Sequence, residues 1–137
     1  MRTQAIVRCI IIKGDGIVLC RNKIWNHYFL PGGGLEIGET MNQAIIRELG
    51  EEMGLKENQI HIHDDSFLAY ENEGMIRGEW HYAIDLVKYV DIDADTVESI
   101  EDKIGFDVVK LSDLPSLELP LYPEKIRNYL IEKFCKK

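Results

Sequence analysis

The sequence predicts an α+β fold in which layers of β-sheet are covered by helices. Runs of β-branched and other apolar residues of strand length recur along the chain, one helical pattern lies at residues 40–54, and a second at 123–135. Four to seven strands with a helix in the middle and another at the end favour sheet layers sandwiched by helices. At 137 residues, the chain is expected to form a single domain, 1–137, with a sizeable core.

The first third of the chain predicts a β-hairpin. Residues 5–13 are β-branched and apolar, and a Gly-Asp-Gly turn connects them to a second apolar run at 17–20. Cys9 and Cys20 fall on these two adjacent predicted strands, and together with Cys135 they follow no metal-ligand spacing. We interpret them as reduced thiols that pack as small hydrophobes rather than as a cross-strand disulfide.

The central helix has sequence signals at both ends. Thr40 and Gln43 have the spacing of a capping box, and Gly54 is the expected glycine after the last turn. The residues expected to face the core, at helical spacing, are Met41, Ala44, Ile45 and Leu49.

The rest of the chain predicts strands, a loop and the final helix. The expected strands are residues 60–63, 67–71, 81–90 and 106–111, with a turn around Gly74 and Gly78. Residues 92–105 are acidic and rich in turn formers, so we expect a loop there. Pro123 suits the first turn of the last helix, and its apolar stripe is expected to be Ile126, Tyr129, Leu130 and Phe134.

Composition and charge narrow the function classes. The formal net charge is −8, from 16 basic and 24 acidic residues, and an acidic surface disfavours long DNA or RNA as a partner. A small nucleotide remains compatible, because bound metal ions reverse the local field. No stretch approaches the roughly 18 apolar residues of a membrane span, and the N-terminus predicts a strand rather than a signal peptide. We therefore expect a cytoplasmic protein without a membrane partner.

An acidic cluster lies near the end of the central helix. Glu48, Glu51 and Glu52 follow one another at the i, i+3 and i+4 spacing that places side chains on one side of a helix. Like charges at that spacing cost about 0.2–0.5 kcal/mol per pair, and the helix dipole disfavours anions in the last turn. A divalent cation, which needs several oxygen ligands, would remove this cost.

The segment 33–55 resembles the signature of the Nudix hydrolase family, the MutT-like pyrophosphohydrolases. Every fixed position is filled, by Gly33, Glu39, Arg47, Glu48, Leu49, Glu51, Glu52, Gly54 and Leu55. The resemblance implies an α/β/α sandwich with a mixed β-sheet, in which the signature forms a loop–helix–loop. It also implies hydrolysis of a nucleoside diphosphate linked to another group, with Mg²⁺ or Mn²⁺ as the cofactor.

The resemblance also implies which residues hold the metal. Glu48, Glu51 and Glu52 match its carboxylate ligands, and the backbone carbonyl of Gly32 matches a further ligand in some relatives. Gly32 and Gly33 are expected to let the backbone approach the diphosphate closely, although a tight turn alone would also explain them.

Arg47 completes the set of expected catalytic residues, as an orienting partner of Glu39 that ties the loop to the helix rather than as a reacting group. The general base is left open by the family pattern. Its candidates are Glu48 and Glu51 in the signature and Glu98 and Glu101 in the late loop.

Aromatic residues outside the signature are candidates for binding a base. Trp25, His27 and Tyr28 precede the glycine loop, and Trp80 opens a strand. Tyr70 lies near the tyrosine of the dinucleoside-polyphosphate subgroup. Among their neighbours, Phe29 and Tyr82 suit core packing better. The basic residues that could reach phosphates, or equally be isolated surface charges, are Arg8, Arg21, Lys23 and Arg77.

The expected substrate is a small nucleotide. A nucleoside triphosphate, oxidised or not, leads dinucleoside polyphosphates and nucleotide sugars. ADP-ribose is disfavoured, because the chain has Ala69-Tyr70-Glu71 where that subgroup carries a proline. The alternatives are a non-catalytic nucleotide-binding module on the same fold and an isomerase of the isopentenyl diphosphate type. A homodimer is common among relatives.

Overall fold

The computed structural model describes residues 2–24, 26–65, 67–76, 78–95, 97–98 and 104–135. Its strands are β1 (Arg2–Ile10), β2 (Ile12–Lys13), β3 (Gly16–Asn22), β4 (His27–Phe29), β5 (Gly32–Gly34), β6 (Ile60–Ile62), β7 (Leu68–Ile76), β8 (Glu79–Ile92) and β9 (Ile104–Lys110). Its α-helices are α1 (Met41–Met53) and α2 (Glu124–Phe134), and short 3-10 helices cover Glu57–Gln59 and Leu111–Ser116.

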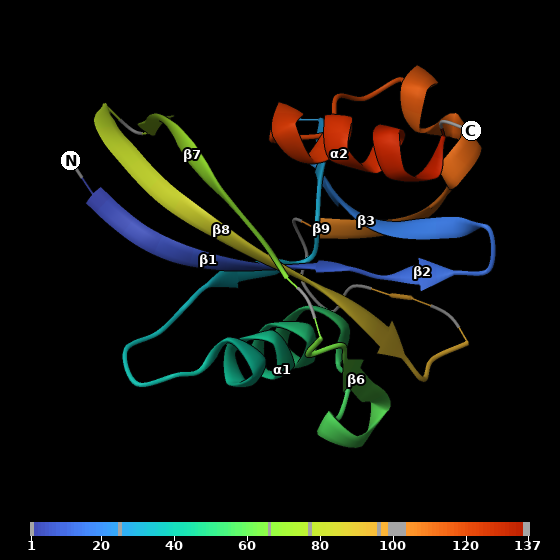
Figure 1. The fold of residues 1–137 in the computed structure, drawn as a ribbon, viewed down its shortest axis with the longest axis horizontal. Coiled ribbons are helices and arrows are strands. Elements are labelled where there is room, and N and C mark those ends of the chain that lie inside the picture. Colours follow the sequence, from blue (N-terminus) through green and yellow to red (C-terminus); the bar gives the residue numbers. More distant parts are fainter. Residues whose placement is uncertain are drawn as a thin grey trace.

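The strands form two sheets (Figure 1). The first is five-stranded and mixed: its order is β5-β1-β8-β6, β7 also pairs with β8, and β1 runs parallel to β8. The second is four-stranded and antiparallel, with the order β2-β3-β4 and with β9 on the other edge of β3. The expectation of a mixed sheet is therefore confirmed, and a separate antiparallel sheet accompanies it.

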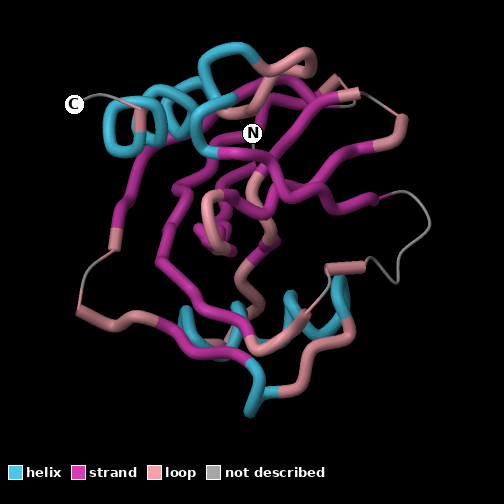
Figure 2. The backbone as a smooth tube through the Cα atoms, turned by 90° about the vertical axis from the view of Figure 1, so that its right-hand side faces the viewer, coloured by secondary structure: helices cyan, strands magenta, loops and turns pink. Residues whose placement is uncertain are grey.

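The two helices lie on opposite sides of the strands (Figure 2). Helix α1 contributes Ala44, Ile45 and Leu49 to a core cluster that includes residues of β1, β3, β6 and β8. Helix α2 contributes Ile126 and Leu130 to a second cluster on the other side. The predicted sandwich of helices and sheets is confirmed.

Strands β1 and β3 are apolar at successive positions because both of their faces are covered. In β1, Val7 and Cys9 pack towards α1 whereas Ile10 packs towards α2. In β3, Val18 belongs to the α1 cluster and Leu19 to the α2 cluster. Alternate side chains of a strand point to opposite faces, so a strand between two helix layers needs a continuous apolar run.

The predicted N-terminal hairpin is only partly right. The Gly-Asp-Gly turn does join β2 to β3, but the strand expected at 5–13 is divided, and its first part, β1, pairs with β5 and β8 instead. Cys9 and Cys20 therefore lie in different sheets, not on adjacent strands. Both are buried, and they do not form the cross-strand disulfide, as expected.

Other boundaries differ in length. Strand β8 extends two residues beyond each end of the predicted run, and β7 continues through Gly74, so the turn lies around Gly78 alone. Pro123 precedes α2 as its N-cap. Two short strands, β4 and β5, were not predicted. Among the described residues, no helix combines the length and hydropathy needed to cross a lipid bilayer.

Helix α1 begins and ends where its capping signals predict. The Thr40 hydroxyl accepts from the Gln43 backbone N–H at 3.1 Å, and the Gln43 side chain accepts from the Thr40 N–H at 2.9 Å. Gly54 adopts the left-handed conformation, with φ of 70°, and its N–H donates to Gly50 O. The position of the glutamates on the last turns of α1 is thus set by local sequence.

Thr40→Ala is expected to lower the free energy of unfolding by about 1 kcal/mol, because the Gln43 N–H loses its acceptor. Urea unfolding measures this difference. Thr3→Ala, at an exposed position of β1, is the matched control, and an equal loss in both variants would contradict the assignment of the cap.

Candidate functional site

Three glutamates on the last turns of α1 differ in their surroundings. Glu52 points inward and is 3% exposed, whereas the Glu51 side chain is 53% exposed. The exposure of the Glu48 side chain is intermediate, at 14%. Helical spacing therefore turns one carboxylate into the protein and one towards solvent, with the third at the boundary.

The glycine strand β5 lies against two of these carboxylates. The Gly32 N–H donates to Glu52 Oε1 at 3.1 Å. A β-carbon on Gly33 would lie 2.4 Å from Glu48 Oε1, so the absence of a side chain there makes room for the carboxylate. The structure thus brings together Glu48, Glu52, Gly32 and Gly33, four of the residues expected in the site.

Gly32 itself must be glycine. Its φ is 140°, a conformation that other residues rarely adopt, and a β-carbon would lie 1.9 Å from the backbone oxygen of Val7. The reason is the pairing of β5 with β1, in which Gly32 is the register partner of Arg8. Reading these glycines only as a loop missed the strand, because a strand made of three glycines has no apolar pattern.

Arg47 connects the loop, the glycine strand and the helix. Its guanidinium binds Glu39 in a bidentate manner, with Nε–Oε2 at 2.7 Å and Nη2–Oε1 at 3.0 Å. It also donates to Gly34 O at 2.8 Å, to Glu48 Oε1 at 2.9 Å and to Glu51 Oε1 at 3.3 Å. The ion pair with Glu39 implied by the family resemblance is present. Bidentate pairing fixes orientation as well as distance.

The electrostatics follow from these contacts. The Arg47 guanidinium holds the pKa of Glu39 below its usual value. Burial raises the pKa of Glu48, and the hydrogen bond and charge of Arg47 oppose that rise. The surroundings of Glu48 therefore disfavour its charged form even though Arg47 lies beside it.

The donor atoms suit a hard divalent cation. Glu48, Glu51, Glu52 and the carbonyl of Gly32 offer only oxygen, the ligand type that Mg²⁺ and Mn²⁺ prefer. Within the described part of the chain, no three acidic, histidine or cysteine side chains converge closely enough to hold a metal ion as they stand. Glu48 and Glu51 accept from Arg47, whereas Glu52 accepts from Gly32. Binding one cation with all three therefore requires side-chain rotation.

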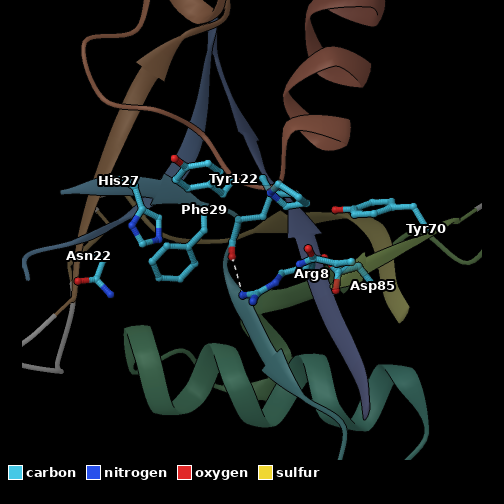
Figure 3. Close-up of a pocket in the computed structure, with 10 residues that line it drawn as sticks. Arg8, Asn22, His27, Phe29, Tyr70, Asp85 and Tyr122 are labelled. Carbon is cyan, nitrogen blue, oxygen red and sulfur yellow. Dashed lines mark hydrogen bonds between the residues drawn. The ribbon is translucent and has the colours of Figure 1, made fainter. Parts of the chain in front are cut away.

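A cavity of about 300 Å³ is lined by residues from both sheets (Figure 3). The residues that line it are Arg8, Asn22, His27, Phe29, Leu30, Tyr70, Asn72, Asp85, Tyr122 and Pro123. Arg8 links the cavity to the glycine strand, since it is the register partner of Gly32, and its Nη1 donates to Leu30 O at 3.0 Å.

The cavity includes some residues predicted to bind substrate and excludes another. Tyr70, Arg8 and His27 line it. Phe29, expected in the core, also lines it, and the Arg8 guanidinium lies 5.6 Å from the centre of its ring. Trp80 is 42% exposed near the end of the β7–β8 hairpin and is absent from the described lining of the cavity, so its role in binding a base stays a prediction.

Several other predicted residues are placed elsewhere. Tyr28 and Arg21 both contact Asp107, at 2.9 and 3.1 Å, in the second sheet. Glu98 is exposed in the segment between β8 and β9. Trp25, Arg77 and Glu101 lie outside the described residues.

Sequence reasoning missed Asp85. This residue is 1% exposed and lines the cavity from β8. A usable signal existed, because Ala83, Asp85 and Val87 alternate on one face of a predicted strand, and all three are buried. A charged residue at a core-facing position of a strand is uncommon and indicates a specific role.

Comparison with known proteins identifies the family. The model of the NUDIX domain matches residues 2–128. The chain belongs to the NUDIX family. In this NUDIX domain, the signature residues 33–55 run from the glycine strand β5 through α1, so the match includes the glutamates and glycines described above.

Curated proteins resemble parts of this NUDIX domain. An RNA pyrophosphohydrolase of Tolumonas auensis is 40% identical over 41% of this chain and 33% of its own length. The nucleoside triphosphatase NudI of an Enterobacter species is 43% identical over 39% of this chain and 42% of its own length. The matched segment thus spans a third to two fifths of these relatives.

Solved structures share the fold of this NUDIX domain over nearly its whole length. A MutT NUDIX hydrolase from Burkholderia pseudomallei has a TM-score of 0.71 with 18% identity, covering 96% of this chain and 99% of its own. An Ap4A hydrolase of C. elegans has a TM-score of 0.67 with 20% identity, covering 97% and 96%. These likenesses confirm the predicted NUDIX fold.

Proposed function

We propose that this NUDIX domain hydrolyses the pyrophosphate bond of a small nucleotide, with Mg²⁺ or Mn²⁺ as cofactor and a nucleoside triphosphate as the leading substrate. The observation that carries the proposal is the convergence of Glu48 and Glu52 on the backbone of Gly32 and Gly33. A buried carboxylate and a less buried second one, both packed against backbone that carries no side chains, are well suited to a cation that must also contact phosphate oxygens.

The chemistry assigns separate tasks to the residues. Glu48, Glu51, Glu52 and the carbonyl of Gly32 would hold the cation, which supplies charge neutralisation of the diphosphate and activation of water. Arg47 orients Glu48 while its bidentate bond to Glu39 holds the loop on the helix. The side-chain-free backbone of Gly33 admits the phosphates, since phosphoryl transfer depends mainly on positioning and charge neutralisation.

The names of relatives support the reaction class, and they are compatible with more than one substrate. The curated proteins that match parts of the chain are named RNA pyrophosphohydrolase and nucleoside triphosphatase. All are named for cleavage of phosphate anhydrides. A cavity of about 300 Å³ is at the small end of ligand sites, roughly 300–1,000 Å³, which suits one nucleoside.

The general base is one of four glutamates in the proposal, and single substitutions separate the late pair from the pair in the signature. Glu48 and Glu51 lie in the cluster, whereas Glu98 and Glu101 belong to the segment before β9. Loss of kcat with unchanged metal affinity in Glu98→Gln or Glu101→Gln would identify a base in the late segment. If neither variant loses kcat, the base is Glu48 or Glu51, whose variants should lose both kcat and metal affinity.

The rival proposal is a non-catalytic nucleotide-binding module. Modules that have lost catalysis usually lose carboxylates of the signature, and this chain keeps all of them. The isomerase alternative needs a catalytic cysteine, and the surroundings of the cysteines disfavour it. Cys9 and Cys20 are buried, and burial raises the pKa of Cys9 far above its usual value.

A panel of nucleotides incubated with the purified chain tests the proposal. Nucleoside triphosphates, dinucleoside polyphosphates and nucleotide sugars are assayed with Mg²⁺ or Mn²⁺, and products are resolved by ion-exchange chromatography. We expect cleavage at the pyrophosphate bridge that stops on addition of a chelator. Absence of turnover of every substrate would favour the binding module, and turnover that survives the chelator would refute the metal requirement.

Gly33→Ala is expected to lower kcat/KM by roughly 10-fold or more with little change in stability, as is typical of changes next to a metal ligand. The added β-carbon would overlap the flexible carboxylate of Glu48, which must turn away. The Mn²⁺ dissociation constant and initial rates measure the effect. Gly34→Ala is the matched control, since among the described residues its β-carbon meets only Gln4 Nε2, at 3.6 Å.

The number of domains, the cellular location and the oligomeric state stay predictions. We infer a single cytoplasmic domain that forms a homodimer, as expected from the sequence and from relatives. Light scattering coupled to size-exclusion chromatography tests the homodimer, and a monomeric mass at micromolar concentration would contradict it.

A further inference from the structure

The lining of the cavity includes two residues that each carry a buried polar atom, Asp85 and Tyr70. Asp85 on β8 and Tyr70 on β7 are register partners in an antiparallel pair, so their side chains leave the sheet side by side on one face. Within the described part of the chain, neither Asp85 Oδ1 nor the Tyr70 hydroxyl has a hydrogen-bond partner. Both residues line the cavity (Figure 3).

A buried carboxylate with an oxygen that lacks a hydrogen-bond partner is costly, and a strand position does not require one. Burial without a hydrogen bond penalises a polar group, and the penalty is largest for a charged one. Alanine or valine would fit the strand better, as the neighbours Ala83 and Val87 show. An acceptor of this kind at the wall of a cavity is explained if a ligand supplies the missing donors.

The rest of the cavity suits a flat aromatic ligand. Phe29 lies beneath the Arg8 guanidinium, and the His27 ring contacts both Phe29 and Tyr122, with ring centres 5.8 and 5.2 Å apart. Aromatic rings and guanidinium planes are the surfaces on which bases stack. Phe29 and Leu30 lead directly into Pro31 and β5, so the cavity and the candidate metal site are consecutive along the chain.

We propose that Asp85 determines base specificity by accepting the N1–H and 2-amino donors of a guanine-type base, while the Tyr70 hydroxyl donates to the adjacent carbonyl oxygen. The inference rests on the proposed function, in that the base belongs to the nucleotide whose phosphates reach the glutamates.

The donor pattern of the bases favours guanine. An ionised carboxylate only accepts hydrogen bonds. Burial raises the pKa of Asp85, whereas the positive charge of Arg8 and any N–H donors that a ligand supplies favour its ionised form. Guanine is the common base that presents two adjacent N–H donors next to a carbonyl oxygen. Adenine places its amino group beside an unprotonated ring nitrogen, whose lone pair would face the carboxylate.

Binding of nucleoside monophosphates to the intact chain in a chelator-containing buffer tests the inference. GMP, IMP and AMP contain no pyrophosphate bond, so the measurement is independent of turnover. Isothermal titration calorimetry or NMR titration gives the dissociation constants. We expect GMP to bind about 10- to 100-fold more tightly than AMP, as bidentate recognition of a base edge provides, with IMP, which lacks the 2-amino group, in between.

Three variants connect this preference to the cavity. Asp85→Asn is expected to reduce the ratio of GMP to AMP affinity by about 10-fold or more, because an amide pairs with adenine and presents a donor to guanine. Tyr70→Phe is expected to weaken GMP and IMP and to leave AMP unchanged. Asp91→Asn, an exposed position on the same strand, is the matched control and should leave all three affinities unchanged.

Stability separates a ligand-binding role from a structural one. Asp85→Asn removes a buried charge, so its melting temperature should equal or exceed that of the wild type. A lower melting temperature with an unchanged GMP to AMP ratio would show that Asp85 is structural, and equal wild-type affinities for GMP and AMP would overturn the inference. If Asp85→Asn does not fold, an unaltered GMP affinity in Tyr70→Phe overturns it. Guanine preference without hydrolysis would refute the proposed function alone.

Discussion

Glu52→Gln is expected to lower kcat/KM for the best nucleotide substrate by at least about 100-fold. Substitution of a residue that merely supports a metal ligand typically costs about 10- to 100-fold, and Glu52 is proposed as a ligand itself. Glutamine keeps an oxygen that can accept from the Gly32 N–H, now at 3.1 Å, but it lacks the charge that binds a cation. Initial rates with Mg²⁺ measure the loss.

Two further measurements make this test specific. Mn²⁺ affinity should fall in Glu52→Gln, whereas circular dichroism should show an intact fold. Glu57→Gln changes an exposed glutamate in the 3-10 helix just after α1 and should retain wild-type rates and Mn²⁺ affinity. Full activity of Glu52→Gln would remove Glu52 from the site.

Gly32→Ala is expected to lower the free energy of unfolding by about 3 kcal/mol or more, or to prevent folding. The residue would have to keep a φ of 140°, and its β-carbon would lie 1.9 Å from the oxygen of Val7. Backbone strain of this type costs about 1–3 kcal/mol, and the overlap with a paired strand adds to it. Urea unfolding followed by circular dichroism measures the change.

Gly34→Ala provides the comparison within the same strand. Its β-carbon has space, and we expect a change within about 1 kcal/mol. Because Gly33→Ala affects rate and Gly32→Ala affects stability, the three variants assign a different task to each glycine of β5. Similar stability in all three would contradict the close approach of β5 to β1.

Helix α1 could be predicted accurately because its determinants are local. The capping box of Thr40 and Gln43 and the left-handed Gly54 act within a few residues of the helix ends. The acidic cluster could be located for the same reason, since helical spacing alone places Glu48, Glu51 and Glu52 near one another. The fixed spacing of the signature then indicated the family.

The surroundings of the cluster could not be predicted from local sequence. That Glu52 would be buried and bound by the Gly32 N–H depends on β5 pairing with β1, a contact between distant segments. The same limit explains the error in the N-terminal hairpin. The pattern of residues 5–13 indicates an extended strand, but it does not say which strand becomes its partner.

Which residues line the cavity could not be predicted from the sequence either. Trp80 is an aromatic candidate for binding a base, yet it lies five residues along β8 from Asp85, roughly 17 Å at strand spacing. Asp85 itself has no motif around it. Its burial and its position opposite Tyr70 arise from the register of β7 and β8.

The sequence by itself determined the family, the extent and caps of α1, and which carboxylates are available to a cation, since these depend on the order and spacing of neighbouring residues. Only the tertiary structure decided that three glycines form a strand, that Glu52 is buried against the Gly32 N–H, and that Asp85 borders the cavity. These features require strands far apart in the chain to pair in one register, and the free energy of that pairing comes from the packing of both cores rather than from any local pattern.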